Sequence, residues 1–160
     1  MKTIDQKAAR RAFVNASKSR AASATFPAAW PDDLDERDLV GWVDPKAPLR
    51  AYVLTDVGDD LTMLELRLPG SSGSRRKSMC DLCHAMDAPE GSLLVVAPRS
   101  GARGRSGDTV GLYVCADFGC SARAREPLPE HRRPADGVPD TRVEELRERI
   151  GAFVARVTGS

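Results

Sequence analysis

Two short stretches decide the fold: Met79-Cys80-Asp81-Leu82-Cys83 and Val114-Cys115-Ala116-Asp117-Phe118-Gly119-Cys120. They contain the four cysteines of the chain, as one Cys-x2-Cys pair and one Cys-x4-Cys pair. Structural zinc sites hold the ion with four tetrahedral ligands, and closely spaced cysteines let one turn offer two thiolates. Two disulfides or four inert core thiols are the alternatives. The spacing favours a zinc (Zn²⁺) site formed by Cys80, Cys83, Cys115 and Cys120.

The composition is that of a globular protein. The chain has 160 residues, a length that is sufficient to bury a hydrophobic core. Of these residues, 41% are hydrophobic and 29% are charged. Its first residues lack the apolar segment of a signal peptide, and no run is long enough to span a membrane. We therefore expect a cytoplasmic protein with no membrane partner. Paired cysteines in a reducing compartment bind metal more often than they form disulfides.

Charge is unevenly distributed along the chain, although the net charge is only +1. Residues 1–29 and 71–125 have an excess of Lys and Arg, whereas residues 30–66 have an excess of Asp and Glu. A basic segment can contact RNA or an acidic protein surface, or it can be a solvated face. The overall balance therefore identifies no partner.

The sequence of the first half of the chain predicts one helix and one hairpin. Apolar residues recur at helical spacing over residues 3–20, which predicts a helix. Residues 26–48 are rich in Pro and Asp, and we expect mostly loop there, with Trp30 and Trp42 as packing anchors. Residues 50–57 and 61–68 are apolar runs around a Gly-Asp-Asp turn, which predicts a β-hairpin.

The second half predicts two more strands and two helices. In chain order these are a strand at 93–97, a basic glycine-rich loop at 99–107, a strand at 108–114, a short helix at 116–125, an irregular proline-rich connection at 127–139 and a helix from Thr141. The last helix has a periodic apolar stripe: Val143, Leu146, Ile150, Phe153 or Val154, and Val157.

The order of these segments is typical of a treble-clef zinc finger. A Cys-x2-Cys turn is followed by a hairpin, and the second cysteine pair lies where the last strand leads into a helix. We therefore expect an α+β fold in a single domain over residues 1–160. It comprises an N-terminal helix, loop and β-hairpin over 1–70, a treble-clef finger over 75–126 and a C-terminal helix over 139–158.

The cysteine site points to a structural role for the metal. Four sulfurs fill a tetrahedral ion and leave no position for a catalytic water. His84 directly follows Cys83, and we expect it beside the turn rather than on the metal. The acidic residues between 32 and 38 lack the register of a calcium loop and are expected in a solvated loop or helix start. We therefore expect a protein that is not an enzyme and has no small-molecule substrate.

Several short sequence motifs, taken together, resemble those of a known family. They are Arg11-Ala12-Phe13-Val14-Asn15, Gly41-Trp42-Val43-Asp44-Pro45-Lys46-Ala47, Met79-Cys80-Asp81-Leu82-Cys83, Gly107-Asp108-Thr109-Val110-Gly111-Leu112-Tyr113-Val114-Cys115-Ala116-Asp117 and Cys120-Ser121. The chain resembles the FBP family, a treble-clef domain related to the C-terminal half of FusB-type elongation-factor-G-binding proteins. The resemblance runs from about residue 3 to about residue 157.

The resemblance implies a non-enzymatic, zinc-stabilised protein that binds translation elongation factor G. The family's four zinc ligands correspond to Cys80, Cys83, Cys115 and Cys120. FusB-type proteins release the factor from ribosomes on which fusidic acid has trapped it. The expected partners are therefore elongation factor G and, together with it or in its place, the ribosome or its RNA.

Basic residues near the cysteines are the candidates for a partner surface. They are Arg75, Arg76, Lys77, Arg99, Arg103, Arg105 and Arg123, with Arg125 as a further neighbour. Guanidinium groups bind carboxylates or phosphates through paired hydrogen bonds. A solvated hairpin tip is the alternative. A zinc finger that binds ribosomal RNA is the second functional hypothesis, and its affinity would fall steeply with salt.

Overall fold

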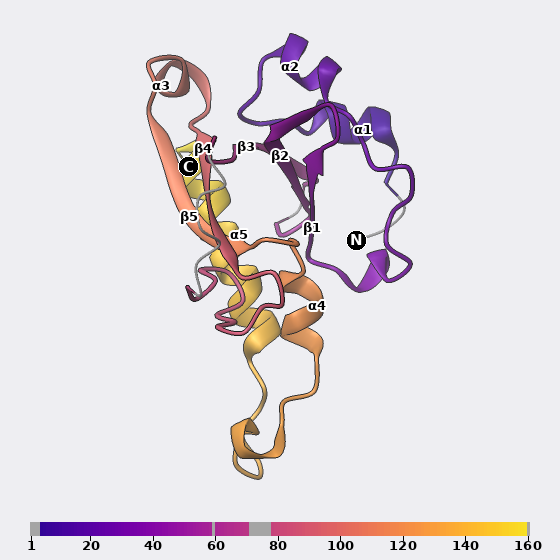
Figure 1. Cartoon of the computed structure of the whole chain (residues 1–160), viewed down its shortest axis with the longest axis vertical. Coiled ribbons are helices and arrows are strands. Elements are labelled where there is room, and N and C mark those ends of the chain that lie inside the picture. Colours follow the sequence, from indigo (N-terminus) through magenta and orange to yellow (C-terminus); the bar gives the residue numbers. More distant parts are fainter. Residues whose placement is uncertain (1–3, 59, 71–77, 160) are drawn as a thin grey trace.

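The computed structural model describes residues 4–58, 60–70 and 78–159. Its elements in chain order are α1 (Gln6–Arg11), α2 (Lys18–Ser23), the 3₁₀ turn η1 (Leu34–Glu36), β1 (Leu39–Asp44), β2 (Ala47–Thr55), β3 (Thr62–Arg67), β4 (Ser92–Pro98), α3 (Gly101–Arg105), β5 (Thr109–Cys115), α4 (Cys120–Arg125), the 3₁₀ turn η2 (Glu130–Arg132) and α5 (Arg142–Thr158). Helices and an antiparallel sheet occur together (Figure 1), which confirms the predicted α+β class.

The sheet has five strands in the order of the chain, each antiparallel to the next. The predicted hairpin is present as β2 and β3, and the two later strands as β4 and β5. Among the described residues, β3 and β4 pair only between Arg67 and Val96. The sheet is therefore joined narrowly in its middle and presents two largely separate ribbons, β1–β3 and β4–β5.

One face of the sheet packs against α5, which runs along β4 and β5 (Figure 1). Leu146, Ile150, Phe153 and Val157 recur at helical spacing on α5, and each is at most 4% exposed. These residues share a buried cluster with inward-facing residues of the strands and with three of the four cysteines. The predicted apolar stripe of the last helix is therefore confirmed, and it anchors the zinc region to the sheet.

The other face of β1–β3 is covered by α1 and α2 and by an aromatic cluster. The rings of Trp30 and Trp42 are 5.5 Å apart, and Trp42 lies 5.5 Å from Tyr52. The indole Nε1 of Trp42 donates a hydrogen bond to the carbonyl of Thr25 at 2.8 Å. Both tryptophans act as packing anchors, as expected. Because β2 is covered on both faces, the last five residues of the strand are all buried.

The predicted helix over residues 3–20 is wrong in its extent. Helix α1 ends at Arg11, and the chain then runs along β3: the amide of Val14 donates to the carbonyl of Met63 at 3.1 Å, and the amide of Met63 donates to the carbonyl of Ala12 at 2.9 Å. The side chain of Asn15 continues this contact by donating to the carbonyls of Glu65 on β3 and Pro98 on β4. The segment satisfies the edge of β3 that β4 leaves unpaired, and this outweighs helix propensity.

Three other boundaries also differ from the sequence-based expectation. Residues 26–48, expected to be mostly loop, contain β1 and the start of β2. The basic loop at 99–107 contains the one-turn helix α3. The short helix expected from 116 begins only at Cys120, because Phe118 has left-handed backbone geometry (φ 55°) and residues 116–119 form a turn.

Candidate metal centre

The first cysteine pair lies in a tight turn that leads toward β4, here called the knuckle (residues 80–85). The amide of His84 donates to the carbonyl of Cys80 at 2.9 Å, and the amide of Cys80 donates to the carbonyl of Ala85 at 3.0 Å. His84 has a positive φ of 57° that closes the turn. The backbone itself therefore holds the sulfurs of Cys80 and Cys83 on one side of the knuckle.

The second pair comes from the end of β5 and the start of α4. Cys115 is the last residue of β5 and Cys120 the first residue of α4. Asp81 of the knuckle joins the two segments: its amide donates to the carbonyl of Tyr113 at 2.8 Å, and its carboxylate accepts from the amide of Tyr113 at 2.6 Å. This bridge aligns the knuckle with β5 and brings both cysteine pairs to one point.

The four sulfurs have the spacing of a tetrahedral zinc site. The Cys80 and Cys120 sulfurs are 3.5 Å apart, as are those of Cys83 and Cys115, and all four lie within 4.8 Å of one another. Four sulfurs at about 2.3 Å from one ion are separated by about 3.8 Å. A disulfide needs about 2.05 Å, so the observed pairs are not bonded. Zn²⁺ fits this donor set, and the four cysteines would hold it.

Among the described residues, this is the one group of Cys, His, Asp and Glu side chains close enough to hold a metal ion. Cys80, Cys115 and Cys120 are buried, and Cys83 is half-buried. Hydrogen bonds from the Cys115 and Cys120 thiols lower the pKa of Cys80, whereas the Cys115 sulfur, the other two sulfurs and burial raise the pKa of Cys120, so zinc would have to displace a proton from the site. Bound zinc would supply a cross-link between the knuckle and the β5–α4 junction, and that is structural chemistry.

An arginine on α4 lies beside the sulfurs. Arg123 forms two hydrogen bonds with the carboxylate of Asp117, at 2.8 and 2.6 Å. The Asp117 carboxylate raises the pKa of Arg123, and the nearby Cys115 sulfur adds to this shift. Four thiolates and one Zn²⁺ carry a net charge of −2, so a held cation offsets part of it. The Cys120-x2-Arg123 spacing, one turn of helix, is the sequence signal that could have revealed this role.

Phe118 fixes the turn between the last two cysteines. Its side chain is buried, at 4% exposed, and its amide donates to the carbonyl of Cys115 at 2.9 Å. The ring packs directly on Gly41 of β1, where an added Cβ would lie 2.5 Å from two ring atoms. The absence of a side chain at Gly41 therefore lets the zinc-binding turn dock against the β1–β3 ribbon.

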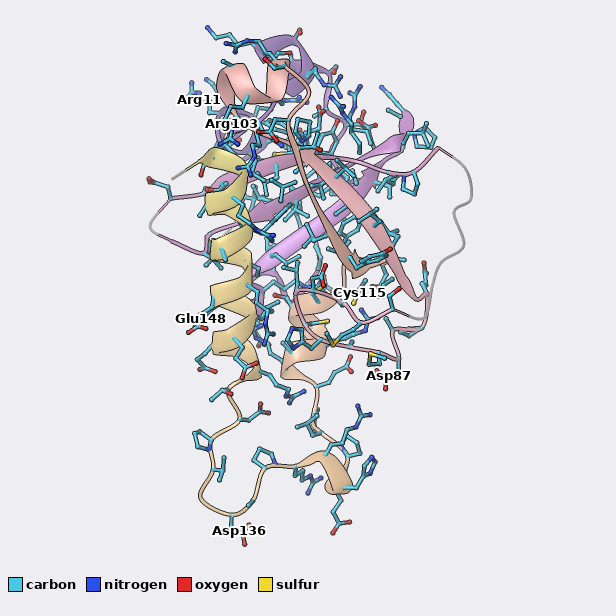
Figure 2. All side chains as sticks on the ribbon, turned by 90° about the vertical axis from the view of Figure 1, so that its left-hand side faces the viewer. Arg11, Asp87, Arg103, Cys115, Asp136 and Glu148 are labelled. Carbon is cyan, nitrogen blue, oxygen red and sulfur yellow. The ribbon has the colours of Figure 1, made fainter. Side chains whose placement is uncertain are left out.

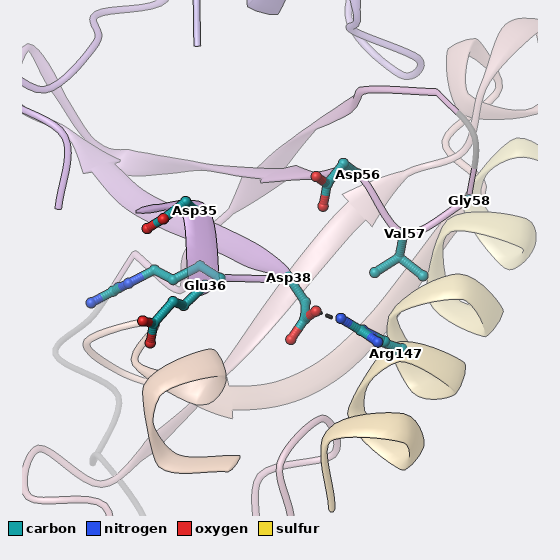
Figure 3. Close-up of a pocket in the computed structure, with 8 residues that line it drawn as sticks. Asp35, Glu36, Asp38, Asp56, Val57, Gly58 and Arg147 are labelled. Atoms are coloured by element: carbon teal, nitrogen blue, oxygen red, sulfur yellow. Dashed lines mark hydrogen bonds and ion pairs between the residues drawn. The ribbon is translucent and has the colours of Figure 1, made fainter. Parts of the chain in front are cut away.

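A buried carboxylate ties the same region to α5. Asp38 is 4% exposed and accepts hydrogen bonds from Arg125 at 2.6 Å and Arg147 at 2.7 Å, the latter drawn in Figure 3. Burial opposes its ionisation, but the two guanidinium groups outweigh burial and lower the pKa of Asp38. Ser121 of α4 accepts a 2.8 Å hydrogen bond from the Asp38 amide. This network joins β1, α4 and α5.

Asp38 also lines a pocket of about 300 Å³ with other acids from the predicted acidic run. Figure 3 shows Asp35, Glu36 and Asp56 around this pocket. Asp35 and Glu36 belong to the turn η1, in agreement with the expected helix start, whereas Asp38 of the same run is buried and not solvated as expected.

The candidate partner residues that the structure describes do not form one surface. Arg75, Arg76 and Lys77 lie outside the described residues. Arg99, Arg103 and Arg105 lie at or near α3, at the end of the β4–β5 ribbon remote from the zinc site (Figure 2). Arg123 is held at the zinc site and Arg125 is held by Asp38.

Ion pairs restrain part of the group near α3 as well. Asp108 pairs with Arg99 at 3.3 Å and with Arg103 at 2.8 Å. Arg105 is exposed and forms no ion pair with a described residue.

None of the helices that the structure describes combines the length and apolarity needed to cross a bilayer.

Comparison with known proteins agrees with this geometry. The family model described as FBP C-terminal treble-clef zinc-finger matches residues 8–157. No curated protein and no solved structure matches the chain. The match covers nearly all of the sequence, including the four cysteines and the strands and helix that position them. The chain therefore belongs to the FBP C-terminal treble-clef zinc-finger family.

Proposed function

We propose that this chain is a non-enzymatic protein that binds translation elongation factor G, free or on the ribosome, and influences its release. The single observation that supports the proposal most strongly is family membership over residues 8–157, because FusB-type proteins act through a domain of this kind. The factor would be the partner, and no small-molecule substrate is involved.

The closed zinc site supports binding rather than catalysis. Four sulfurs account for all four positions of a tetrahedral ion, so zinc would shape a surface and would not activate water. The knuckle, α4 and the start of α5 surround a groove of about 490 Å³ beside this site. Four arginines that line it are ion-paired within the chain: Arg123, Arg132, Arg142 and Arg149.

Two exposed methionines flank the knuckle and are candidate contacts. Met79 is 44% exposed and Met86 is 61% exposed. Methionine is flexible and polarizable, and it occurs often at adaptable protein-binding surfaces. A patch that combines apolar methionines with a rim of restrained arginines has the composition of a protein interface. We place the factor-binding surface here.

Capture of purified elongation factor G on the immobilised, zinc-loaded chain, with and without ribosomes, tests the proposal. Retention under either condition supports it, and failure under both overturns it. Met86→Lys should weaken capture about tenfold or more, as truncation of an interface anchor does. Val138→Lys is the matched control, because Val138 is 57% exposed but does not line the groove beside the zinc site.

Release of the factor is tested separately from its capture. Ribosomes stalled with the factor and fusidic acid are sedimented with and without the chain. Transfer of the factor to the supernatant supports a role in release. Retention of the factor on the ribosomes would restrict the proposed function to binding.

A further inference from the structure

A second surface, remote from the zinc site, is unusually rich in arginine. A cavity of about 380 Å³ lies along the start of β2, and one of about 360 Å³ lies between α2, β3 and α3. Arg20 and Arg67 line both cavities, so the two cavities adjoin each other. We call this surface the arginine groove and define it by Arg20, Arg50, Arg67, Arg99 and Arg105.

The charges of this groove are poorly balanced within the chain. Of the described residues in the lining, Glu65 is the only acidic one, and Arg20 engages it from two nitrogens, one contact being 2.8 Å. Among the described residues, Arg50, Arg67 and Arg105 form no ion pair. The groove therefore presents several guanidinium groups whose charge the described part of the chain does not neutralise.

The placement of two of these arginines opposes stability. Arg50 of β2 and Arg67 of β3 are directly opposite each other in the antiparallel ladder. Side chains at such positions have Cβ atoms about 5 Å apart, and like charges there are destabilising. Violations of local rules with no structural gain occur preferentially at functional sites. An anionic group that binds both guanidinium groups would replace this repulsion with two attractive contacts.

The lining favours a phosphate backbone over the other anionic partners. Guanidinium groups bind phosphate oxygens in a planar, two-pronged geometry. The described lining contains no aromatic side chain, so it offers neither the anchors typical of protein interfaces nor the platforms that stack bases. Cations from α2, β2, β3 and α3 line two adjoining cavities, and such a series of charges suits a polymer with a charge on every unit.

We propose that the arginine groove binds the phosphodiester backbone of RNA without reading its bases. This goes beyond binding of the elongation factor and depends on different residues, so each can fail alone. Sequence reasoning identified Arg99 and Arg105 as candidates for a partner surface but missed Arg20, Arg50 and Arg67. Arg50 lies 30 residues after Arg20, and Arg67 lies 17 residues after Arg50. The strand register brings Arg50 and Arg67 together, and the contact with Glu65 places Arg20 beside β3.

Fluorescence anisotropy with the full, zinc-loaded chain and a labelled oligouridylate of about 20 nucleotides tests this proposal. Each phosphate contact on a single strand contributes about 0.7 to the slope of log affinity against log salt. The double variant Arg67→Gln/Arg105→Gln should reduce this slope by about 1.4 and weaken binding about 25-fold at about 0.1 M salt. Zinc content and the thermal melt verify that the variant is folded.

The matched control removes the same charge elsewhere. Arg132→Gln/Arg133→Gln changes two exposed arginines on the loop between α4 and α5, outside the arginine groove, and of these Arg132 pairs with Asp87 at 3.3 Å. It should leave RNA affinity nearly unchanged. Equal losses in both double variants would show diffuse electrostatic attraction and overturn the proposal, as would no loss in the groove variant or no RNA binding by the unmodified chain at low salt.

A competition experiment distinguishes phosphate from carboxylate partners. Polyglutamate at the same charge concentration should displace the oligouridylate much less effectively than unlabelled oligouridylate does. Equal displacement would indicate that the groove accepts any polyanion, including an acidic protein segment, and would overturn the assignment to RNA.

Discussion

Replacement of Gly41 by alanine should destabilise both the sheet and the zinc site. An ideal Cβ at this position lies 2.5 Å from two ring atoms of Phe118 and 2.8 Å from its Cβ. Carbon atoms in contact prefer about 3.5–4.0 Å, so the strand and the ring must separate by about 1 Å. Gly41→Ala therefore forces apart β1 and the turn that joins Cys115 to Cys120.

The ring has little freedom to relieve this contact. Phe118 is 4% exposed, and its left-handed backbone is held by the hydrogen bond to Cys115. Overpacking of a closed core costs about 1–3 kcal/mol, and the constrained turn places this case near the upper part of that range. For a chain of this size, about 2 kcal/mol corresponds to a decrease of about 4–8 °C in melting temperature.

Urea titration followed by circular dichroism, with zinc bound, measures the free energy of unfolding. Gly111→Ala is the matched control, since Gly111 also lies in a strand and an added Cβ there meets Leu94 at 3.5 Å, an ordinary contact. The control should remain within about 0.5 kcal/mol of the unmodified chain. Equal stability of the two variants would refute the steric argument.

A double variant separates steric overlap from a general loss of strand stability. Phe118→Leu replaces the ring with a smaller side chain and should relieve the overlap created by Gly41→Ala. The double variant should be less destabilised than the sum of the two single variants by about 1 kcal/mol. Strict additivity would show that the two positions do not contact each other as the structure has them.

Three further predictions concern the zinc site and its supports. Cys115→Ser should release zinc and unfold the region around it, and a variant that retains one zinc per chain by elemental analysis would contradict the four-sulfur site. Arg123→Met should lower zinc affinity about 10–100-fold in competition with a chromophoric chelator, whereas unchanged affinity would remove Arg123 from the site. Asp38→Asn should cost about 2 kcal/mol at neutral pH, measured by urea titration. Because the pKa of Asp38 is lowered, its ion pairs stabilise the fold above the unfolded pKa of about 3.9 and are lost as pH falls through the folded value. The difference in stability between the Asp38→Asn variant and the unmodified chain should therefore vanish in acid, and a constant difference would contradict this role.

Local sequence signals predicted the parts of the fold that depend on near neighbours. The β2–β3 hairpin followed from two apolar runs around a turn, and α5 followed from a periodic apolar stripe. Strand β1 was missed because Gly41 and the nearby prolines and acids are typical of loops, while the strand is stabilised by pairing with β2. The predicted N-terminal helix extended beyond the end of α1, because the backbone hydrogen bonds between residues 12–14 and Met63 cannot be recognised from helical periodicity.

The same distinction applies to functional residues. Arg123 and Arg99 are both arginines in a basic part of the sequence, yet one lies at the zinc site and the other near α3, at the far end of the β4–β5 ribbon. Charge composition records how many cations a segment has, whereas strand direction determines which end of a ribbon each one occupies. Arg50 and Arg67 came together only through the register of β2 and β3.

The sequence by itself determined the zinc ligands and the order of the treble-clef segments, because two cysteines within one turn are held close by a few backbone bonds. Only the tertiary structure decided what surrounds that site and what lies away from it: Phe118 against Gly41, Asp38 between two arginines, and the arginine groove. These contacts join residues far apart in the chain, and their geometry depends on how whole elements pack rather than on any local spacing.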